Sequence, residues 1–356
     1  MQSFAGRAAV AGVGMTALSR ESGRGELELA TEACRAACAD AGIAPGEVDA
    51  LLSYHMNDSA PVVQVARALG IERLGWHNDI AGGGTQAASI LGDAAMLVHC
   101  GLADNVLIYR ALNGRSGRRM NTVSTGPQER FTYGLAGPVP LFALAATRYL
   151  HDTGLTAEHL HAVVAQSRDN ARANPRALRR EPLALADYLA RPYVCTPLRT
   201  VDCCQETDGA CALLVSGVLD GPRVHAVVRG GGPGCSSMDR APDVTAIFSA
   251  YVAPMLWRAS GMRHSDVDVV LPYDAYSWLV PRQLEDFGFV ARGDLGAYLL
   301  ERRHARVNPH GGLLSEGYVH GLNNVAQAVR ELRGGREVAL VTGFGGGYGS
   351  AALLVS

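Results

Sequence analysis

The stretch Ile80-Ala-Gly-Gly-Gly-Thr-Gln-Ala87 places three consecutive glycines before a segment of small and apolar residues. A helix that is apolar on every side is a buried helix, so Thr85–His99 is expected to lie inside the protein. This helix is predicted to stop at Gly101, and the apolar run Asn105–Tyr109 then predicts a strand. A glycine turn, a buried helix and a strand in this order indicate an α/β protein whose sheet is covered on both faces.

The same order of elements returns near the C-terminus. A glycine-rich turn, Gly311–Gly321, precedes a helix of small residues, Leu322–Leu332, and the strand Val338–Val341 follows. A duplicated α/β unit is therefore predicted, because a repeated unit changes the fold expected of the whole chain. The expected halves are residues 1–220 and 221–356, with an insertion at about 113–199 that covers the active face.

Periodicity and glycine stops place the remaining elements. Strands are expected at Ala8–Val13, Val48–Ser53, Val224–Val228 and Val267–Leu271. Helices are expected at Glu26–Ala41, Val62–Leu69, Val139–His151 and Ala157–Asn174. Strands that alternate with helices at this spacing favour a parallel or mixed sheet.

Composition excludes several classes of function. The 356 residues are 48% hydrophobic and carry a net charge of −2, so no basic field exists to hold nucleic acid or an anionic membrane. The chain has no lysine, and all 32 basic residues are arginine. A lysine Schiff base, a lysine general base and a P-loop lysine are thereby excluded. No apolar stretch is long enough to span a bilayer.

The eight cysteines contain no Cys-x-x-Cys pair, and the N-terminus lacks the features of a secretory signal, so no disulfide framework is expected. We therefore expect a reducing, cytoplasmic compartment. No group of His, Asp or Glu residues has convincing metal-ligand spacing, and Tyr318-Val-His320 alone is not such a group. No metal and no bound cofactor are predicted.

Four blocks resemble the thiolase superfamily, in its branch related to sterol-carrier-protein-x thiolase and the bacterial lipid-transfer thiolases. They are Ile80–Ala87, Asp202-Cys-Cys-Gln-Glu-Thr-Asp-Gly-Ala-Cys-Ala212, Asn308-Pro-His-Gly-Gly-Leu-Leu-Ser-Glu-Gly-Tyr-Val-His-Gly321 and Gly343-Phe-Gly-Gly-Gly-Tyr-Gly349. The blocks span nearly the whole chain in the expected order, and Ser167–Leu178 is similar to the branch's covering loop. The resemblance implies a duplicated thiolase fold, with two βαβαβαββ halves layered α-β-α-β-α. It also implies a homodimer paired through an edge strand, expected near Val106.

The family's catalytic groups are missing from the matching positions. Ala81 stands where the nucleophilic cysteine belongs, Tyr318 replaces the histidine of the Gly-His-Pro motif, and Gly343 replaces the second cysteine. The Asn-Glu-Ala-Phe-like motif reads Tyr273-Asp-Ala-Tyr276, so Tyr273 stands at the Asn or His position. Acyl transfer through a cysteine is therefore not expected.

The replacements favour a different reaction in a fold that binds acyl-CoA thioesters and stabilises their enolates. Without a nucleophile, such a site can still cleave a β-hydroxyacyl-CoA by retro-aldol chemistry. The chain resembles the thiolase-like steroid side-chain aldolases. The resemblance implies a 17-hydroxy steroid acyl-CoA as substrate, with a ketone and propionyl-CoA as products. It also implies a small OB-fold, zinc-ribbon-type partner domain that belongs to a hydratase subunit.

Tyr318, Tyr273 and His320 are the candidate catalytic residues. A tyrosine that serves as a base near pH 7 needs a neighbouring donor or charge that lowers its pKa. Backbone N–H groups of glycines can point at a developing oxyanion. The candidate substrate-binding residues are accordingly Gly345, Gly346, Gly347 and Tyr348.

Weaker candidates and two other functions stay open. Arginines of the insertion could bind the phosphates of CoA: Arg115, Arg118, Arg119, Arg168, Arg172 and Arg176. Cys235 is a remote candidate for a nucleophile. The alternative functions are a non-catalytic acyl-CoA-binding or scaffold subunit, and a condensing enzyme (acyltransferase) that takes its acyl donor from another protein. A scaffold has no need for tyrosines at both vacated positions, and a condensing enzyme needs a nucleophile.

Overall fold

The computed structural model describes residues 4–117, 129–233, 238, 241–302 and 306–356. Within these residues, nine strands form one mixed sheet in the order β3-β2-β4-β7-β1-β8-β11-β10-β9. The strands are β1 (Ala9–Met15), β2 (Ala50–His55), β3 (Trp76–Ala81), β4 (Asn105–Asn113), β7 (Asp208–Ser216), β8 (Arg223–Gly231), β9 (Val269–Leu271), β10 (Val338–Phe344) and β11 (Tyr348–Val355). A separate ribbon in the expected insertion pairs β5 (Tyr193–Cys195) with β6 (Leu198–Arg199).

The helices predicted from periodicity are confirmed, with ends that differ from the expected ones by less than a turn. The α-helices are α1 (Glu26–Ala41), α2 (Val62–Leu69), α3 (Gln86–His99), α4 (Glu129–Thr132), α5 (Val139–Thr153), α6 (Ala157–Ala171), α7 (Leu185–Leu189), α8 (Ser249–Ser260), α9 (Leu279–Asp286), α10 (Leu295–Leu300), α11 (Gly312–Ser315) and α12 (Leu322–Arg333). Both α1 and α2 end at a glycine in the left-handed conformation, Gly42 and Gly70, which is the usual glycine cap.

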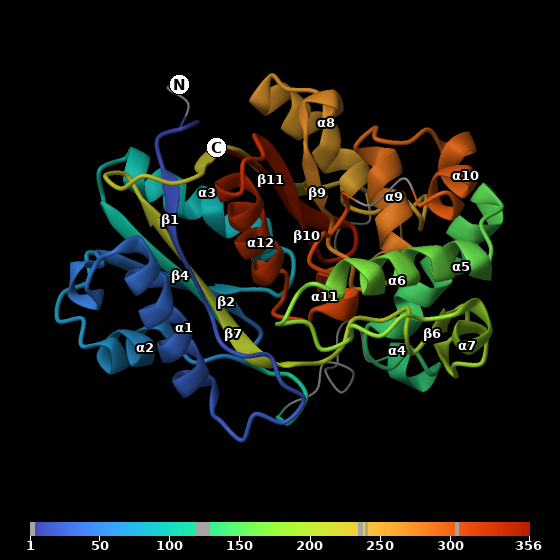
Figure 1. Cartoon of the computed structure of the whole chain (residues 1–356), viewed down its shortest axis with the longest axis horizontal. Coiled ribbons are helices and arrows are strands. Elements are labelled where there is room, and N and C mark those ends of the chain that lie inside the picture. Colours follow the sequence, from blue (N-terminus) through green and yellow to red (C-terminus); the bar gives the residue numbers. More distant parts are fainter. Residues whose placement is uncertain (1–3, 118–128, 234–237, 239–240, 303–305) are drawn as a thin grey trace.

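The sheet has two halves that are joined where β1 meets β8. These two strands pair at one position, Ala9 with Arg223. One half of the sheet is β3-β2-β4-β7-β1, and the other is β8-β11-β10-β9. Helices α3 and α12 contact strands of both halves, whereas α1 packs outside the first half and α8 outside the second. Figure 1 shows α3 and α12 between the two sets of strands. The expected α-β-α-β-α layering is therefore present.

Small residues allow the central helices to approach the sheet. A β-carbon at Gly92 of α3 would lie 3.0 Å from the side chain of Val227 on β8. At Gly321, just before α12, φ is +83° and a β-carbon would lie 2.8 Å from the ring of Tyr273. Only glycine fits such a conformation and such a contact. Glycine therefore allows α3 to approach β8 and the start of α12 to approach Tyr273.

The second half departs from the expected strand pattern at one point. Its fifth strand is reduced, in the described residues, to one bridge between Val307 and Val270 of β9. The chain turns immediately afterwards, because Asn308 has a positive φ of 46° and donates its backbone N–H to the carbonyl of Val270. The second half therefore repeats the layers of the first half but has one regular strand fewer.

The prediction that the strand near Val106 forms an edge of the sheet is wrong. Val106 lies on β4, which is hydrogen-bonded to β2 on one side and to β7 on the other. Such a strand has no free backbone edge. The exposed edge of this half is β3, where Trp76 is 45% exposed.

Candidate active site

A cavity of about 360 Å³ lies where both central helices begin, beneath part of the expected insertion. Its walls come from the glycine turn before α3, the residues around α4 and α5, the segment before β7, the loop after β9, the turn before α12, and the β10–β11 loop. The lining residues are Met56, Gly82, Gly83, Gly84, Thr85, Arg130, Pro138, Leu141, Phe142, Cys204, Glu206, Met238, Tyr273, Ala275, Tyr276, Tyr318, His320, Phe344, Gly345, Gly347 and Tyr348.

Two tyrosines predicted from separate motifs meet in this cavity. The hydroxyl of Tyr273 donates to the hydroxyl oxygen of Tyr318 at 2.8 Å. Tyr273 follows β9, and its backbone N–H donates to Thr342 Oγ1 of β10 at 2.8 Å. Gly84 faces the Tyr273 ring, since a β-carbon there would lie 2.2 Å from the hydroxyl oxygen. The glycine turn before α3 therefore makes room for the tyrosine pair.

Both phenols are neutral at physiological pH. Burial raises the pKa of Tyr318 well above its ordinary value, and the hydrogen bond with Tyr273 offsets only part of that rise. Burial likewise raises the pKa of Tyr273, and the neighbouring Tyr318 adds to the effect. No phenolate base is therefore preformed, because the groups that lower the pKa of Tyr318 do not outweigh its burial.

His320, two residues after Tyr318, lies in a buried polar chain. Arg110 of β4 donates to His320 Nδ1 from Nε at 3.0 Å and from Nη2 at 2.7 Å. The same guanidinium is paired with Asp58 at 2.7 Å. Burial lowers the pKa of His320 far below its ordinary value, and the positive charge of Arg110 lowers it further. The imidazole is therefore neutral.

The predicted glycine run lies partly on the cavity wall. Gly345 and Gly347 line the cavity, as does Tyr348, which is 46% exposed. Gly346 is absent from the lining residues: it has a φ of +95°, and its carbonyl accepts from the Phe248 N–H. A β-carbon at Gly345 would lie 2.0 Å from Thr85, so this loop packs tightly on the start of α3.

The two vacated cysteine positions differ in the space around them. Ala81 ends β3, is exposed, and does not line the cavity. Gly343 lies on β10, where a β-carbon would be 2.5 Å from the carbonyl oxygen of Gly84 and 2.6 Å from Ser350 Oγ. No side chain fits at Gly343 without moving its neighbours.

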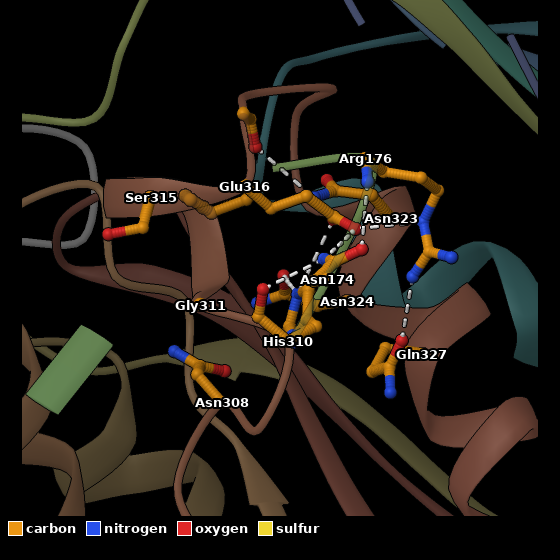
Figure 2. Close-up of polar contacts among 12 residues, drawn as sticks. Asn174, Arg176, Asn308, His310, Gly311, Ser315, Glu316, Asn323, Asn324 and Gln327 are labelled. Atoms are coloured by element: carbon orange, nitrogen blue, oxygen red, sulfur yellow. Dashed lines mark hydrogen bonds and ion pairs between the residues drawn. The ribbon is translucent and has the colours of Figure 1, made fainter. Parts of the chain in front are cut away.

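A buried polar network supports the turn that carries Tyr318. Glu316 is fully buried and accepts from Asn174 at 2.9 Å, Asn323 at 2.9 Å and Arg176 at 3.1 Å. Figure 2 shows these side chains converging on the Glu316 carboxylate from two parts of the chain, 174–176 and 323. Burial opposes ionisation, but His310, the two amides and Arg176 outweigh it, so the pKa of Glu316 is lowered. The network therefore holds an ionised carboxylate two residues before Tyr318.

Two of the arginine candidates are occupied elsewhere, and the described ones lie outside the cavity wall. Arg176 belongs to the Glu316 network, and Arg168 is buried and donates to the carbonyl of Glu181 at 3.3 Å. Neither they nor Arg115 and Arg172 are among the lining residues of the cavity. Arg118, Arg119 and Cys235 lie outside the described residues. The arginine that does line the cavity, Arg130, was not a candidate.

The sequence reasoning missed several cavity and supporting residues. Arg110 carries a signal that could have been used, because a charged residue inside the apolar run Val106–Leu112 requires a buried partner. Asp58 and Glu206 carry no such signal, since each stands in a polar stretch. Within the described part of the chain, no cluster of three or more His, Cys, Asp or Glu residues could hold a metal ion. Within that part, no helix is long and apolar enough to cross a membrane.

Alkylation tests whether a thiol takes part. Cys204 lines the cavity, but burial raises its pKa well above the ordinary value, and burial raises that of Cys203 to about 12. The thiolate is the reactive form, so stoichiometric iodoacetamide is expected to leave turnover intact. The measurement is residual activity beside circular dichroism; lost turnover in a folded protein would contradict the expectation.

Comparison with known proteins decides the family. The chain is 37% identical to the 17-hydroxy-3-oxo-4-pregnene-20-carboxyl-CoA lyase of Mycobacterium tuberculosis, over 93% of this chain and 92% of the relative. It belongs to the thiolase superfamily, in the branch of the steroid side-chain-cleaving aldolases. Identity to the steroid side-chain-cleaving aldolase of Thermomonospora curvata is 36%, over 94% of this chain and 92% of that relative. The Thiolase C-terminal domain-like family matches residues 234–355.

Solved structures agree with this assignment, one of them an aldolase and the other a thiolase that shares the fold. The Ltp2-ChsH2(DUF35) aldolase superposes with a TM-score of 0.91 and 34% identity, covering 100% of this chain and 99% of that one. Human mitochondrial 3-ketoacyl-CoA thiolase in complex with CoA gives a TM-score of 0.76 at 15% identity, over 98% of both chains. The second match shows the fold alone. The resemblance read from the four sequence blocks is thereby confirmed.

Proposed function

We propose that this aldolase cleaves a β-hydroxyacyl-CoA by a retro-aldol reaction. The proposed substrate is a 17-hydroxy steroid side-chain acyl-CoA, and the products are a 17-ketone and propionyl-CoA. The observation that carries the proposal is the hydrogen-bonded pair Tyr273–Tyr318 in a cavity of the thiolase fold that lacks the family's cysteines. The names of the two relatives support the substrate class.

The proton transfer follows from the neutral phenols. The substrate's hydroxyl gives its proton to the oxygen of Tyr318 as the Cα–Cβ bond breaks and the hydroxyl carbon becomes a ketone. The electron pair of the broken bond moves into the thioester as an enolate. Tyr318 passes its own original proton to the α-carbon of that enolate, which completes propionyl-CoA and leaves the phenol neutral. Tyr273 donates to Tyr318 throughout, and this bond polarises the second phenol.

The cavity wall suits an apolar ring system next to this polar group. Leu141, Phe142, Phe344 and Met238 line it, and Phe142 packs against Phe344 with ring centroids 5.0 Å apart. A volume of about 360 Å³ is within the range of roughly 300–1,000 Å³ for small-molecule sites. The acyl part can enter, while the nucleotide of CoA must lie outside.

The remaining site residues are assigned by position. Gly345 and Gly347 line the cavity beside Tyr348, and we assign this loop, with Gly346 between them, to the binding of the thioester. His320 lines the same cavity beside Tyr318, with ring centroids 4.9 Å apart. We therefore group His320 with the two tyrosines as the third catalytic residue.

A partner domain is part of the proposal. The structure with a TM-score of 0.91 is named as an Ltp2-ChsH2(DUF35) aldolase, which supports a complex between this chain and a DUF35-type partner. We propose that this partner is the small OB-fold, zinc-ribbon-type domain of a hydratase subunit.

The test is a direct assay with the partner domain present. A steroid 17-hydroxyacyl-CoA is incubated with the protein, and ketone and propionyl-CoA are quantified. Formation of both products in equal amounts is expected. Binding of the acyl-CoA without cleavage would favour the scaffold alternative, and consumption of a second acyl donor would favour the condensing enzyme.

We further propose a homodimer that pairs through β3. This strand has one free edge and an exposed Trp76, and pairing of two such edges continues the sheet. Light scattering on the protein with its partner domain is expected to show two copies of this chain. A mass with one copy would remove the claim.

A further inference from the structure

A buried arginine fixes how the proton is placed on His320. The Arg110 side chain is 0% exposed, and its N–H groups point at the Asp58 carboxylate, at His320 Nδ1, and at the carbonyl of Ala111 at 2.7 Å. A guanidinium can donate hydrogen bonds but cannot accept them. Nδ1 must therefore accept, and the proton of the neutral ring is on Nε2.

A second proton on this ring is disfavoured by its surroundings. The titratable groups around the ring are Arg110, Asp58, Tyr318 and, below its backbone, Tyr54. A proton on Nδ1 would point at the Arg110 guanidinium, so it would remove two hydrogen bonds and place two positive charges in contact. Asp58 is already paired with Arg110 at 2.7 Å. The ring is therefore kept in one neutral tautomer.

His320 lines the cavity, and its Nε2–H group has no hydrogen-bond partner in the described protein. His320 is 1% exposed, and Nε2 is buried without a hydrogen bond among those residues. A β-carbon at Gly83 would lie 3.5 Å from Nε2, so glycine leaves space on that side. An unsatisfied buried donor costs about 1–3 kcal/mol. Such a donor marks the place of a ligand oxygen.

The backbone around His320 is held in an unusual conformation. Its φ is +46°, which is uncommon for a residue other than glycine. The Tyr54 hydroxyl donates to the His320 carbonyl at 3.0 Å, and Gly321 follows at once with φ +83°. The ring is thereby fixed from both ends, by Tyr54 at the backbone and by Arg110 at Nδ1.

We propose that the chain Asp58–Arg110–His320 presents a neutral imidazole N–H to the thioester carbonyl oxygen of the substrate, and that this N–H stabilises the enolate oxygen during cleavage. The inference rests on the proposed function, because it assigns one oxygen of that substrate to His320. Tyr318 stands beside the ring and handles the hydroxyl proton, so we assign the thioester carbonyl oxygen to His320, within the thioester group that the Gly345–Gly347 loop binds. A fixed neutral donor is already oriented when negative charge develops.

The experiment compares three single variants and one double variant with the wild-type protein in its complex. His320→Phe keeps a planar ring without a donor, and is expected to lower kcat by about 10²–10³-fold with a small change in KM. His320→Gln restores an N–H and is expected to recover a measurable part of that loss. Arg110→Met is expected to lower kcat because the ring loses its fixed tautomer.

The double variant His320→Phe/Arg110→Met tests whether Arg110 affects kcat by positioning His320 or only by packing in the protein interior. If Arg110 acts through His320, the double variant is expected to have the kcat of His320→Phe alone. Melting curves by circular dichroism identify any variant that fails to fold. If an Arg110 variant fails to fold, the kcat values of His320→Phe and His320→Gln alone test the inference. Equal kcat for His320→Phe and wild type overturns the inference. Absence of cleavage by the wild type would instead remove the proposed function.

Discussion

Replacement of Tyr318 by phenylalanine is expected to lower kcat by at least about 10²-fold, since a positioned proton-transfer group contributes typically about 10²–10⁴-fold. The ring and its packing remain, so the fold is expected to survive. KM is expected to change far less, because the lost interaction belongs to the transition state. The measurement is steady-state kinetics of propionyl-CoA release.

The Tyr318 experiment has a matched control and a companion. Tyr193→Phe makes the same chemical change on a tyrosine that is 51% exposed and absent from the cavity wall, and kcat is expected to stay at the wild-type value. Tyr273→Phe removes the donor that lies 2.8 Å from Tyr318 and is expected to lower kcat in the same direction. A Tyr318→Phe protein that turns over at nearly the native rate would end the tyrosine mechanism and leave the fold assignment untouched.

Glu316→Gln is expected to destabilise the protein by about 3 kcal/mol, at the lower end of what a broken buried ion pair costs. Both carboxylate oxygens accept from donors, namely Asn174, Arg176 and Asn323. A glutamine would turn an NH₂ group toward one of these donors. The free energy of unfolding from urea titration at pH 7 measures the loss.

The pH dependence of this loss has a defined sign. The pKa of Glu316 is lowered in the folded protein from its ordinary value of 4.5, so its ionised form contributes stability above that value and loses it as pH falls through the folded pKa. The difference between wild type and Glu316→Gln is therefore expected to shrink below about pH 4.5. Asp152→Asn, in the exposed pair with Arg148, serves as the control and is expected to change stability little. An equal effect of both substitutions would contradict the role of the network.

The fold could be read from the sequence because its signals are local. The glycine turns before Thr85 and Leu322, together with apolar runs, are enough to place both central helices and most strands. The order of strands is not local, so the edge was assigned to the strand at Val106 when it belongs to β3. A strand's neighbours depend on crossovers that no short stretch encodes.

The candidate site, too, could be predicted from the sequence only in part. Motif positions brought out Tyr273, Tyr318 and His320, and the structure places all three on one cavity. The sequence could not give the direction in which the tyrosine pKa values shift, because the burial that raises them is a tertiary property. Arg110 lies 210 residues from His320 along the chain, so their pairing could not be read from spacing.

The close approach at Gly343 limits how this enzyme can change in evolution. A cysteine restored there would bring its β-carbon to 2.5 Å from the Gly84 carbonyl, so the turn before α3 would have to move. That same turn at Gly84 accommodates Tyr273, whose hydroxyl lies where a side chain at Gly84 would project. A return to a thiol at this position is therefore blocked by the turn that accommodates Tyr273. A cysteine at position 343 would need a compensating change in that turn, whereas the exposed position of Ala81 carries no such constraint.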